Sequence, residues 1–214
     1  NVWNDVRKMN GDIYYLLQTY GYSTDLDKSI FAPAREGEVV LCLNYGGLYG
    51  INNINHFLQE SNTGKAIWRG IQRYKVGDPI LFNDASDKFF TRTEEQLPVI
   101  HNNMTGRIVD FLLLNEGKAT EGIQFDIEID RPLIDMDMKD MDFTIVGTAA
   151  NGNSIIRFVV NKNKTTDEDD EGPSKAIVPF QIAYAVSIHK AQGLEYDHVK
   201  IIITDEIDEL ITHS

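Results

Sequence analysis

The stretch AYAVSIHKAQGLEYD, residues 183–197, decides the fold of this chain. Its first residues are apolar with helical spacing. Within residues 187–195 they give way to a hydroxyl, an imidazole, an ammonium, an amide, a glycine and a carboxylate. A mostly β-branched run follows at residues 199–203. A purely structural helix has no need for so many polar groups in this order, so we expect a helix that carries chemistry and leads into a strand.

A second informative stretch lies far upstream. Residues 38–44, EVVLCLN, form a short apolar run that ends in Tyr-Gly-Gly, which suits a buried parallel strand that leaves through a glycine turn. Residues 50–59, GINNINHFLQ, then carry apolar side chains at helical spacing. Strand, turn and helix in this order make half of a Rossmann-type unit. We therefore predict an α/β fold in which residues 38–44 and 198–204 lie in one parallel sheet.

Both stretches resemble motifs of one family. Residues 187–195 resemble motif V of superfamily 1 helicases, most of all the RecD-like branch of superfamily 1B, where Ser/Thr-x-His-Lys-x-Gln-Gly precedes a strand of the second RecA-like domain. Residues 50–59 resemble motif IV of the same helicases, in the expected order. The resemblance implies the C-terminal motor domain, RecD-like or UvrD-like, of an ATP-dependent DNA helicase. Such an enzyme couples ATP hydrolysis to single-strand translocation and duplex unwinding.

By this resemblance, three side chains would contact nucleic acid: Ser187, His189 and Lys190. A helix that follows a strand can present such groups and its own backbone to phosphates. Structural alternatives stay open at each position. His and Lys near a helix C-terminus are favoured by the helix dipole, and a serine hydroxyl within a helix can bond back to a carbonyl.

The turn after that helix would face the nucleotide. By the resemblance, the residues next to the ATP phosphates and ribose are Gln192, Gly193 and Glu195. Gly193 can also be explained by the left-handed conformation that ends many helices, and Glu195 by a solvated loop. The resemblance implies ATP and Mg²⁺ as cofactors, both bound mainly by the family's N-terminal RecA-like domain.

Several parts of such an enzyme are absent from the sequence. Lys28 and Lys65 each sit beside a serine or a glycine, but neither has the G-x-x-x-x-G-K-[ST] spacing of a P-loop. Asp205 and Glu206 resemble a Walker B pair, which is useful only beside a P-loop, so we read them as strand-end acids. The last arginine is Arg157, whereas the family's motif VI arginine follows motif V. We expect a fragment that is inactive alone, with single-stranded or forked DNA and the enzyme's own N-terminal RecA-like domain as partners.

The middle of the chain has a different character. Residues 74–82 and 102–110 combine glycine turns with β-branched runs, and residues 124–129 and 154–160 alternate with period two. These patterns predict an all-β insert. The phrases VGDPI and NMTGRIV resemble the small SH3-like barrel that RecD-type helicases carry inside their second RecA-like domain.

These patterns together predict two domains. A RecA-like domain 2A of the P-loop NTPase type would be discontinuous, comprising residues 1–74 and 176–214. The inserted β-barrel domain 2B would span residues 75–175. A polar segment near residues 161–175, rich in acids, predicts a flexible return loop.

Some side chains of the insert are open to either packing or binding. Four phenylalanines could stack on bases, although small barrels need such residues as core: Phe82, Phe89, Phe90 and Phe111. Scattered cations could line a groove or be ordinary surface charge: Lys75, Lys88, Arg92 and Arg107. Three residues near the predicted domain boundary are as open to packing as to binding: Trp68, Arg69 and Tyr74.

Composition limits these interpretations. The chain has 214 residues, 42% of them apolar, which is enough for proper cores. Its net charge of −13 argues against broad adhesion to a polyphosphate, because that binding is driven by Lys and Arg. Much of the negative charge is concentrated at residues 135–142 and 167–171, which we read as solvated loops.

Other features bear on compartment and chemistry. The sequence lacks an apolar run long enough for a membrane span and a signal peptide at its start, so we expect a cytoplasmic protein without membrane contact. The resemblance adds DNA repair as its setting. Cys42 is the only cysteine and is expected to be a small buried hydrophobe. No Cys/His spacing predicts a metal site. The alternative function is a non-catalytic nucleic-acid or protein binding module with a RecA-like shell.

Overall fold

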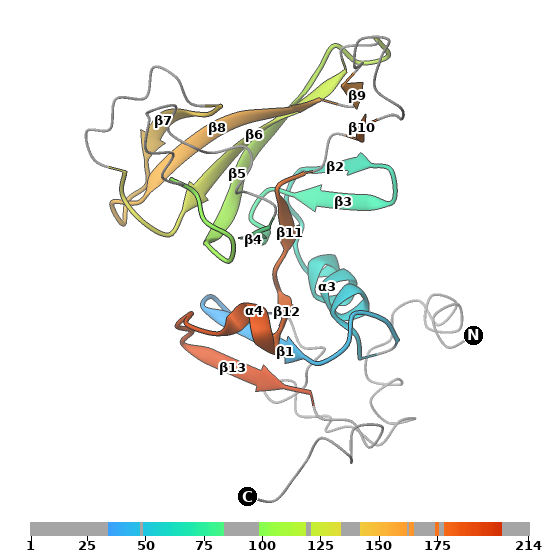
Figure 1. Ribbon diagram of the computed structural model, residues 1–214, viewed down its shortest axis with the longest axis vertical. Coiled ribbons are helices and arrows are strands. Elements are labelled where there is room, and N and C mark those ends of the chain that lie inside the picture. The colour runs from blue at the N-terminus through green and yellow to red at the C-terminus, as the bar shows by residue number, and fades with distance from the viewer. Residues whose placement is uncertain are drawn as a thin grey trace, which may run out of the picture. The chain divides into compact units, whose positions relative to one another are not determined.

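The computed structural model describes residues 34–47, 49–83, 99–118, 121–133, 142–161, 163–164, 174–175 and 178–202. The chain divides into two compact units, one from Asn1–Thr63 with Ala183–Ser214 and the other from Gly64–Ile182 (Figure 1). Residues 1–33 lie outside the described residues, as do Asp205 and Glu206. In the described part of the chain, no helix is long and apolar enough to cross a membrane.

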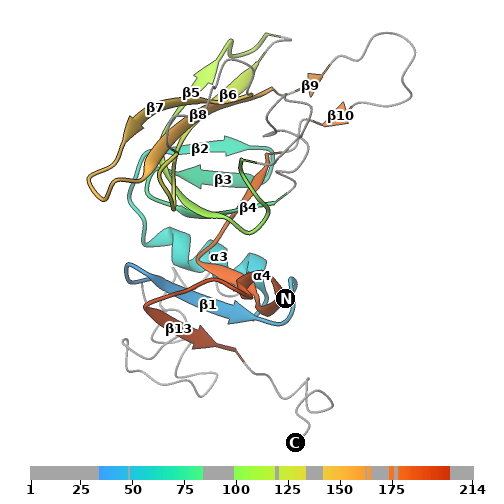
Figure 2. The same ribbon diagram turned by 60° about the vertical axis from the view of Figure 1, so that its left-hand side comes forward.

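The first unit is built on a parallel three-stranded sheet in the order β12-β1-β13. Strand β1 (Glu38–Cys42) lies between β12 (Ala185–Ser187) and β13 (His198–Ile201). Figure 2 shows β1 and β13 side by side and pointing the same way. The predicted parallel pairing of two strands from opposite ends of the sequence is therefore confirmed.

Helix α3 (Ile51–Glu60) follows β1 and packs against β1 and β12. Its apolar stripe is buried through Ile51, Ile54 and Leu58, which confirms the helix predicted at residues 50–59. Gly50 precedes the helix at a point where only glycine fits, because an added Cβ would lie 2.2 Å from the carbonyl oxygen of Gly46. The loop after β1 thus folds back tightly before the helix begins.

Residues 183–187 correct the prediction. Their spacing favoured a helix, but Ala185–Ser187 forms strand β12, and only Ile188–Ala191 is helical, as α4. A short apolar run cannot be assigned to strand or helix by periodicity alone. Here Ala185 and Val186 are fully buried beside β1, so pairing with a distant strand outweighs the weak local pattern.

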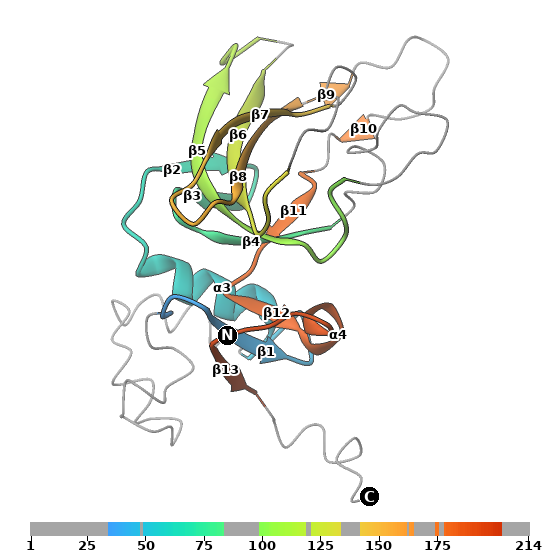
Figure 3. The same cartoon turned by 90° about the vertical axis from the view of Figure 1, so that its left-hand side faces the viewer.

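The second unit contains an antiparallel six-stranded sheet, shown in Figure 3. In spatial order its strands are β11 (Phe180–Ile182), β4 (Pro79–Phe82), β5 (Thr105–Leu114), β6 (Gly122–Ile129), β8 (Ser154–Asn161) and β7 (Thr144–Thr148). Two short antiparallel pairs accompany it: β2 (Ala66–Arg69) with β3 (Gln72–Lys75), and β9 (Asn163–Lys164) with β10 (Ser174–Lys175). Within the residues of this region that the structure describes, the predicted all-β character is confirmed.

Three details of this unit differ from the sequence-based expectations. The described strands form an open sheet, in which the edge strands β11 and β7 are not joined, rather than a closed barrel. The predicted return loop at residues 161–175 contains the β9–β10 pair. The division between units falls after Thr63 and after Ile182, compared with residues 74 and 175 in the sequence-based domains. It differs because β11 pairs with β4, and because Tyr74 of β3 packs on the same aromatic core.

Aromatic side chains fill the core of the second unit around Phe180. Its ring centroid lies 5.1 Å from that of Phe125 and 5.6 Å from that of Tyr74, both edge to face. Phe82 and Phe111 are also buried, which confirms packing over base stacking for these two. Phe89 and Phe90 lie outside the described residues.

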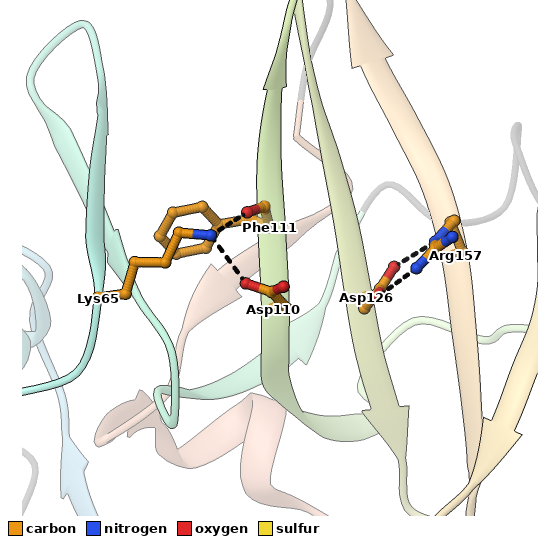
Figure 4. Close-up of polar contacts among 5 residues, drawn as sticks. All are labelled: Lys65, Asp110, Phe111, Asp126 and Arg157. Atoms are coloured by element: carbon orange, nitrogen blue, oxygen red, sulfur yellow. Dashed lines mark hydrogen bonds and ion pairs between the residues drawn. The ribbon is translucent and has the colours of Figure 1, made fainter.

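The opposite face of the same sheet carries paired charges (Figure 4). Lys65 Nζ donates to Asp110 Oδ1 at 2.9 Å, and Arg157 makes two hydrogen bonds of 2.6 Å to the carboxylate of Asp126. Asp110 and Asp126 are direct cross-strand neighbours, an arrangement that destabilises a sheet unless the charge is compensated. Each carboxylate has its own cation, and the hydrogen bond from Lys65 lowers the pKa of Asp110.

Candidate functional site

All six predicted contact residues lie in one connection, which runs from β12 through α4 and a turn to β13. Ser187 is paired in register with Cys42, so the connection starts at the carboxyl edge of the parallel sheet, where the loop after β1 also starts. Asp197 donates its backbone N–H to the carbonyl of Gly37, so the connection ends at the opposite edge. In open α/β sheets, ligands bind outside the carboxyl ends of the strands. The structure thus places the start of this connection where such folds bind ligands.

Ser187 is the N-cap of α4. Its Oγ accepts a hydrogen bond from the backbone N–H of Lys190 at 3.3 Å, while the residue itself is buried. A serine cap of this kind stabilises a helix start by about 1 kcal/mol. Ser187 therefore precedes the helix as its N-cap and does not lie within it. The hydroxyl proton still has the capacity to donate to a ligand.

His189 and Lys190 lie on the single turn of α4. His189 is exposed and Lys190 is half-buried. The turn starts at the buried end of β12, so its position relative to the sheet is fixed by strand pairing.

The turn after α4 is exposed at Gln192, Gly193 and Glu195. Gly193 has a φ of 83°, and no atom lies within 4 Å of the position that a Cβ would take. Only the left-handed backbone therefore requires glycine here, as the sequence suggested. Leu194 donates its N–H to the carbonyl of Ala191 at 3.0 Å, which closes the helix end.

Asn55 of α3 forms two hydrogen bonds with the backbone of β12. Its side-chain oxygen accepts from the N–H of Ala185 at 2.8 Å, and its side-chain nitrogen donates to the carbonyl of Ala185 at 2.9 Å. The amide thus replaces a neighbouring strand on the side of β12 away from β1. Helix α3 thus holds the strand β12, which leads into α4. The apolar pattern that identified α3 gave no signal for this role.

The start of α3 does not offer a phosphate site. Ile51 donates its N–H to the carbonyl of Asn44 at 2.9 Å, and Asn52 donates to that of Tyr45 at 3.2 Å. The N–H of Asn53 is bonded to the carbonyl of Gly50 at 3.1 Å. Because these amides already have partners, they are not available to an anion.

Other polar groups of the sheet serve structure. Lys200 Nζ lies 2.7 Å from Glu38 Oε1, a largely buried ion pair between β13 and β1. Cys42 is buried as predicted, and burial raises the pKa of its thiol to about 11, so it stays protonated and unreactive. Among the described residues, no group of three or more His, Cys, Asp or Glu side chains could hold a metal ion.

The β2–β3 hairpin is a functional candidate that the sequence motifs did not indicate. Residues 64–77 contain four cations and no acid, although the whole chain has a net charge of −13. Trp68 of this hairpin is exposed, and its ring faces the guanidinium of Arg73 at 5.4 Å. Of the cations considered earlier for a groove, Lys75 is buried, Arg107 is exposed, and Lys88 and Arg92 lie outside the described residues. A local count of charge would have identified this segment.

Comparison with known proteins gives a weak structural likeness. No protein-family model matches the chain, and no curated protein matches it. Among solved structures it is similar to the crystal structure of Bacteroides sp. Pif1 in complex with ADP-AlF4, at 14% identity and a TM-score of 0.36. The match covers 91% of this chain and 43% of that one, so the chain spans less than half of that protein. At this TM-score the likeness carries no structural argument.

Proposed function

We propose that the first unit is the C-terminal RecA-like domain, 2A, of an ATP-dependent DNA helicase, and that the second unit is its insert, 2B. The observation that carries the proposal is the position of the string from Ser187 to Glu195. It begins at the carboxyl edge of a parallel sheet whose central strand is followed by the motif IV-like helix. The two motif-like segments are linked directly, because Asn55 of α3 bonds to Ala185 in the strand that leads into α4.

In this proposal Ser187, His189 and Lys190 contact single-stranded nucleic acid. Lys190 supplies a charge to a phosphate, His189 a hydrogen bond worth roughly 0.5 to 1.5 kcal/mol, and Ser187 a hydroxyl while it caps the turn. Because α4 is fixed to β12, a movement of the sheet would be transmitted to the bound strand. This would couple the motor to translocation.

The exposed turn with Gln192, Gly193 and Glu195 fits an outer contact to ATP: the open space at Gly193 admits a ligand, and Gln192 and Glu195 can bond a ribose or its phosphates. The described residues do not fit a complete triphosphate and Mg²⁺ site, since they include neither a P-loop nor a cluster of acids. ATP supplies the energy of hydrolysis when bound. This chain's part would be to sense the nucleotide and to hold the strand.

The test uses the complete enzyme and single-stranded oligonucleotides over a range of salt. Removing one phosphate contact by Lys190→Ala should reduce the slope of log K against log salt by about 0.7. His189→Ala should weaken binding without that change in slope. Both should reduce ATP turnover stimulated by single strands more than unstimulated turnover. Lys118→Ala, which removes an exposed lysine of the second unit, is the matched control and should change neither property.

If Lys190→Ala changes neither the salt slope nor the stimulation of ATP turnover by single strands, α4 has a structural role only. A complete gene that lacks a P-loop upstream would favour the alternative function, a non-catalytic binding module with a RecA-like shell.

A further inference from the structure

The tip of the β2–β3 hairpin exposes large apolar side chains. Ile71 is 98% exposed and Trp68 is 57% exposed. They lie on one short hairpin, with Trp68 on β2 and Ile71 in the turn after it. Exposed apolar side chains that gather at one place mark interaction sites more often than isolated ones do.

The hairpin is held firmly on its own unit. Tyr74 of β3 points inward, and its ring lies 5.4 Å from that of Phe125. Arg69 donates from its guanidinium to the carbonyls of Val160 and Asn161, at 3.2 and 2.8 Å. A support of this kind lowers the entropy lost when a ligand binds, because the binding surface is already ordered.

The turn itself adds to this order. Gly70 has a φ of 60°, whereas Ile71 does not have a positive φ, which matches the type II′ turn that suits a two-residue hairpin. The turn fixes the direction in which Ile71 leaves the hairpin. The exposed tip is therefore a defined surface.

The outward face combines a ring with positive charge. Trp68 and Arg73 are direct cross-strand partners, and the guanidinium lies 5.4 Å from the centre of the indole ring. Residues 64–77 hold four cations and no acid in a chain of net charge −13. Of these cations, Lys65 is paired with Asp110 and Lys75 is buried, so Arg73 is the one that lies beside the exposed ring. A cation next to an aromatic ring fits a nucleic-acid strand, in which a phosphate follows each base.

We propose that the outward face of the β2–β3 hairpin is a platform for single-stranded nucleic acid. One base stacks on Trp68, the backbone phosphate next to it lies near Arg73, and Ile71 contacts the neighbouring base. Stacking on an aromatic ring tolerates every base, since each base has a π-face. The inference rests on the proposed function, to which it adds a second contact, in the other unit, with the same class of ligand.

The experiment compares two ligands on this chain by fluorescence anisotropy. One is a labelled oligo-dT, and the other is an abasic deoxyribose-phosphate oligomer of the same length. Trp68→Ala should weaken dT binding about 5- to 150-fold and leave binding of the abasic oligomer nearly unchanged. Trp68→Phe should recover part of the loss. Leu112→Ala is the control, because Leu112 is 53% exposed on the same unit and lies outside the hairpin.

Each outcome decides the matter. Unchanged dT binding in Trp68→Ala, or an equal loss with both oligomers, would overturn the platform. If Lys190→Ala lowers the salt slope while Trp68→Ala has no effect, the proposed function stands and the platform fails; the reverse leaves the platform and removes the contact at α4. Self-association that Ile71→Ser abolishes, with dT binding unchanged, would assign the tip to a protein contact instead.

Discussion

The two units of this chain place their polar groups in different ways. In the parallel sheet, β1 and β12 are mostly buried and the exposed polar groups come after β12 ends, in α4 and its turn. In the antiparallel sheet, side chains alternate between faces, so charges such as Asp126 and Arg157 pair across strands on the outer face. Parallel strands are covered on both faces, whereas antiparallel strands can leave one face in water. Chemistry should therefore be sought beyond strand ends in the first unit, and on faces and hairpin tips in the second.

The largest expected effect concerns the aromatic core of the second unit. Phe125 is fully buried and its ring contacts those of Tyr74, Phe158 and Phe180. Phe125→Ala should lower the free energy of unfolding of this unit by about 3 to 5 kcal/mol, because it removes a large buried ring and leaves a cavity. Hydrogen exchange read by mass spectrometry, peptide by peptide, measures the loss in each unit.

Peptides of β1 and β12 should keep their protection in Phe125→Ala, and the exposed Leu112→Ala should change stability by less than about 0.5 kcal/mol. An equal loss of protection in both units would show that they unfold as one body and would remove the basis of the comparison.

As pH rises into the alkaline range, the first unit should lose stability before the second. Burial raises the pKa of Cys42 from 9.0 to about 11, and that of Tyr74 from 10.0 to about 12. Each group is protonated in the folded state and ionises more readily in the unfolded state. Its contribution is therefore complete below the unfolded pKa and is lost as pH rises through the folded pKa. A shift of this size corresponds to about 2 to 3 kcal/mol per group.

Urea unfolding at several pH values between 8 and 12 measures this loss. The first unit should begin to lose stability near pH 9 and the second near pH 10. Cys42→Ala should remove the earlier part of the decline, and Tyr74→Phe the later part. A decline that both variants retain in full would assign it to other groups.

A smaller effect is expected from the hydrogen bonds between Asn55 of α3 and the backbone of β12. Asn55→Leu removes both hydrogen bonds to Ala185 and leaves two backbone groups of a fully buried residue without partners. The first unit should lose about 1 to 3 kcal/mol, and the Ala185 amide should exchange faster. Amide exchange followed by NMR measures both effects.

Asn52→Leu provides the matched control for Asn55→Leu, since Asn52 is exposed on the same helix. It should leave the exchange of Ala185 unchanged. Unaltered exchange in Asn55→Leu as well would mean that β12 does not depend on this amide.

Local patterns predicted much of the fold. Helix α3 follows from a period of 3.6, strands β6 and β8 from a period of 2, and strand β1 from a short continuous apolar run. The prediction failed at Ala185 and Val186, because a short apolar run fits either conformation and the choice depends on pairing with β1. The sequence could not predict whether the sheet of the second unit closes into a barrel. Closure depends on whether β7 and β11 pair, and these strands are far apart in the chain.

The sequence alone determined the order of the polar groups from Ser187 to Glu195 and the need for glycine at Gly193, because these depend on the chain within a few residues. Tertiary structure decided where that string lies, at the carboxyl edge beside Cys42, and which helix secures it, through Asn55. It also decided which aromatic residues are buried and that Trp68 is exposed. Burial and edge position arise from contacts between segments far apart in the chain, whereas periodicity and turn chemistry act between neighbours.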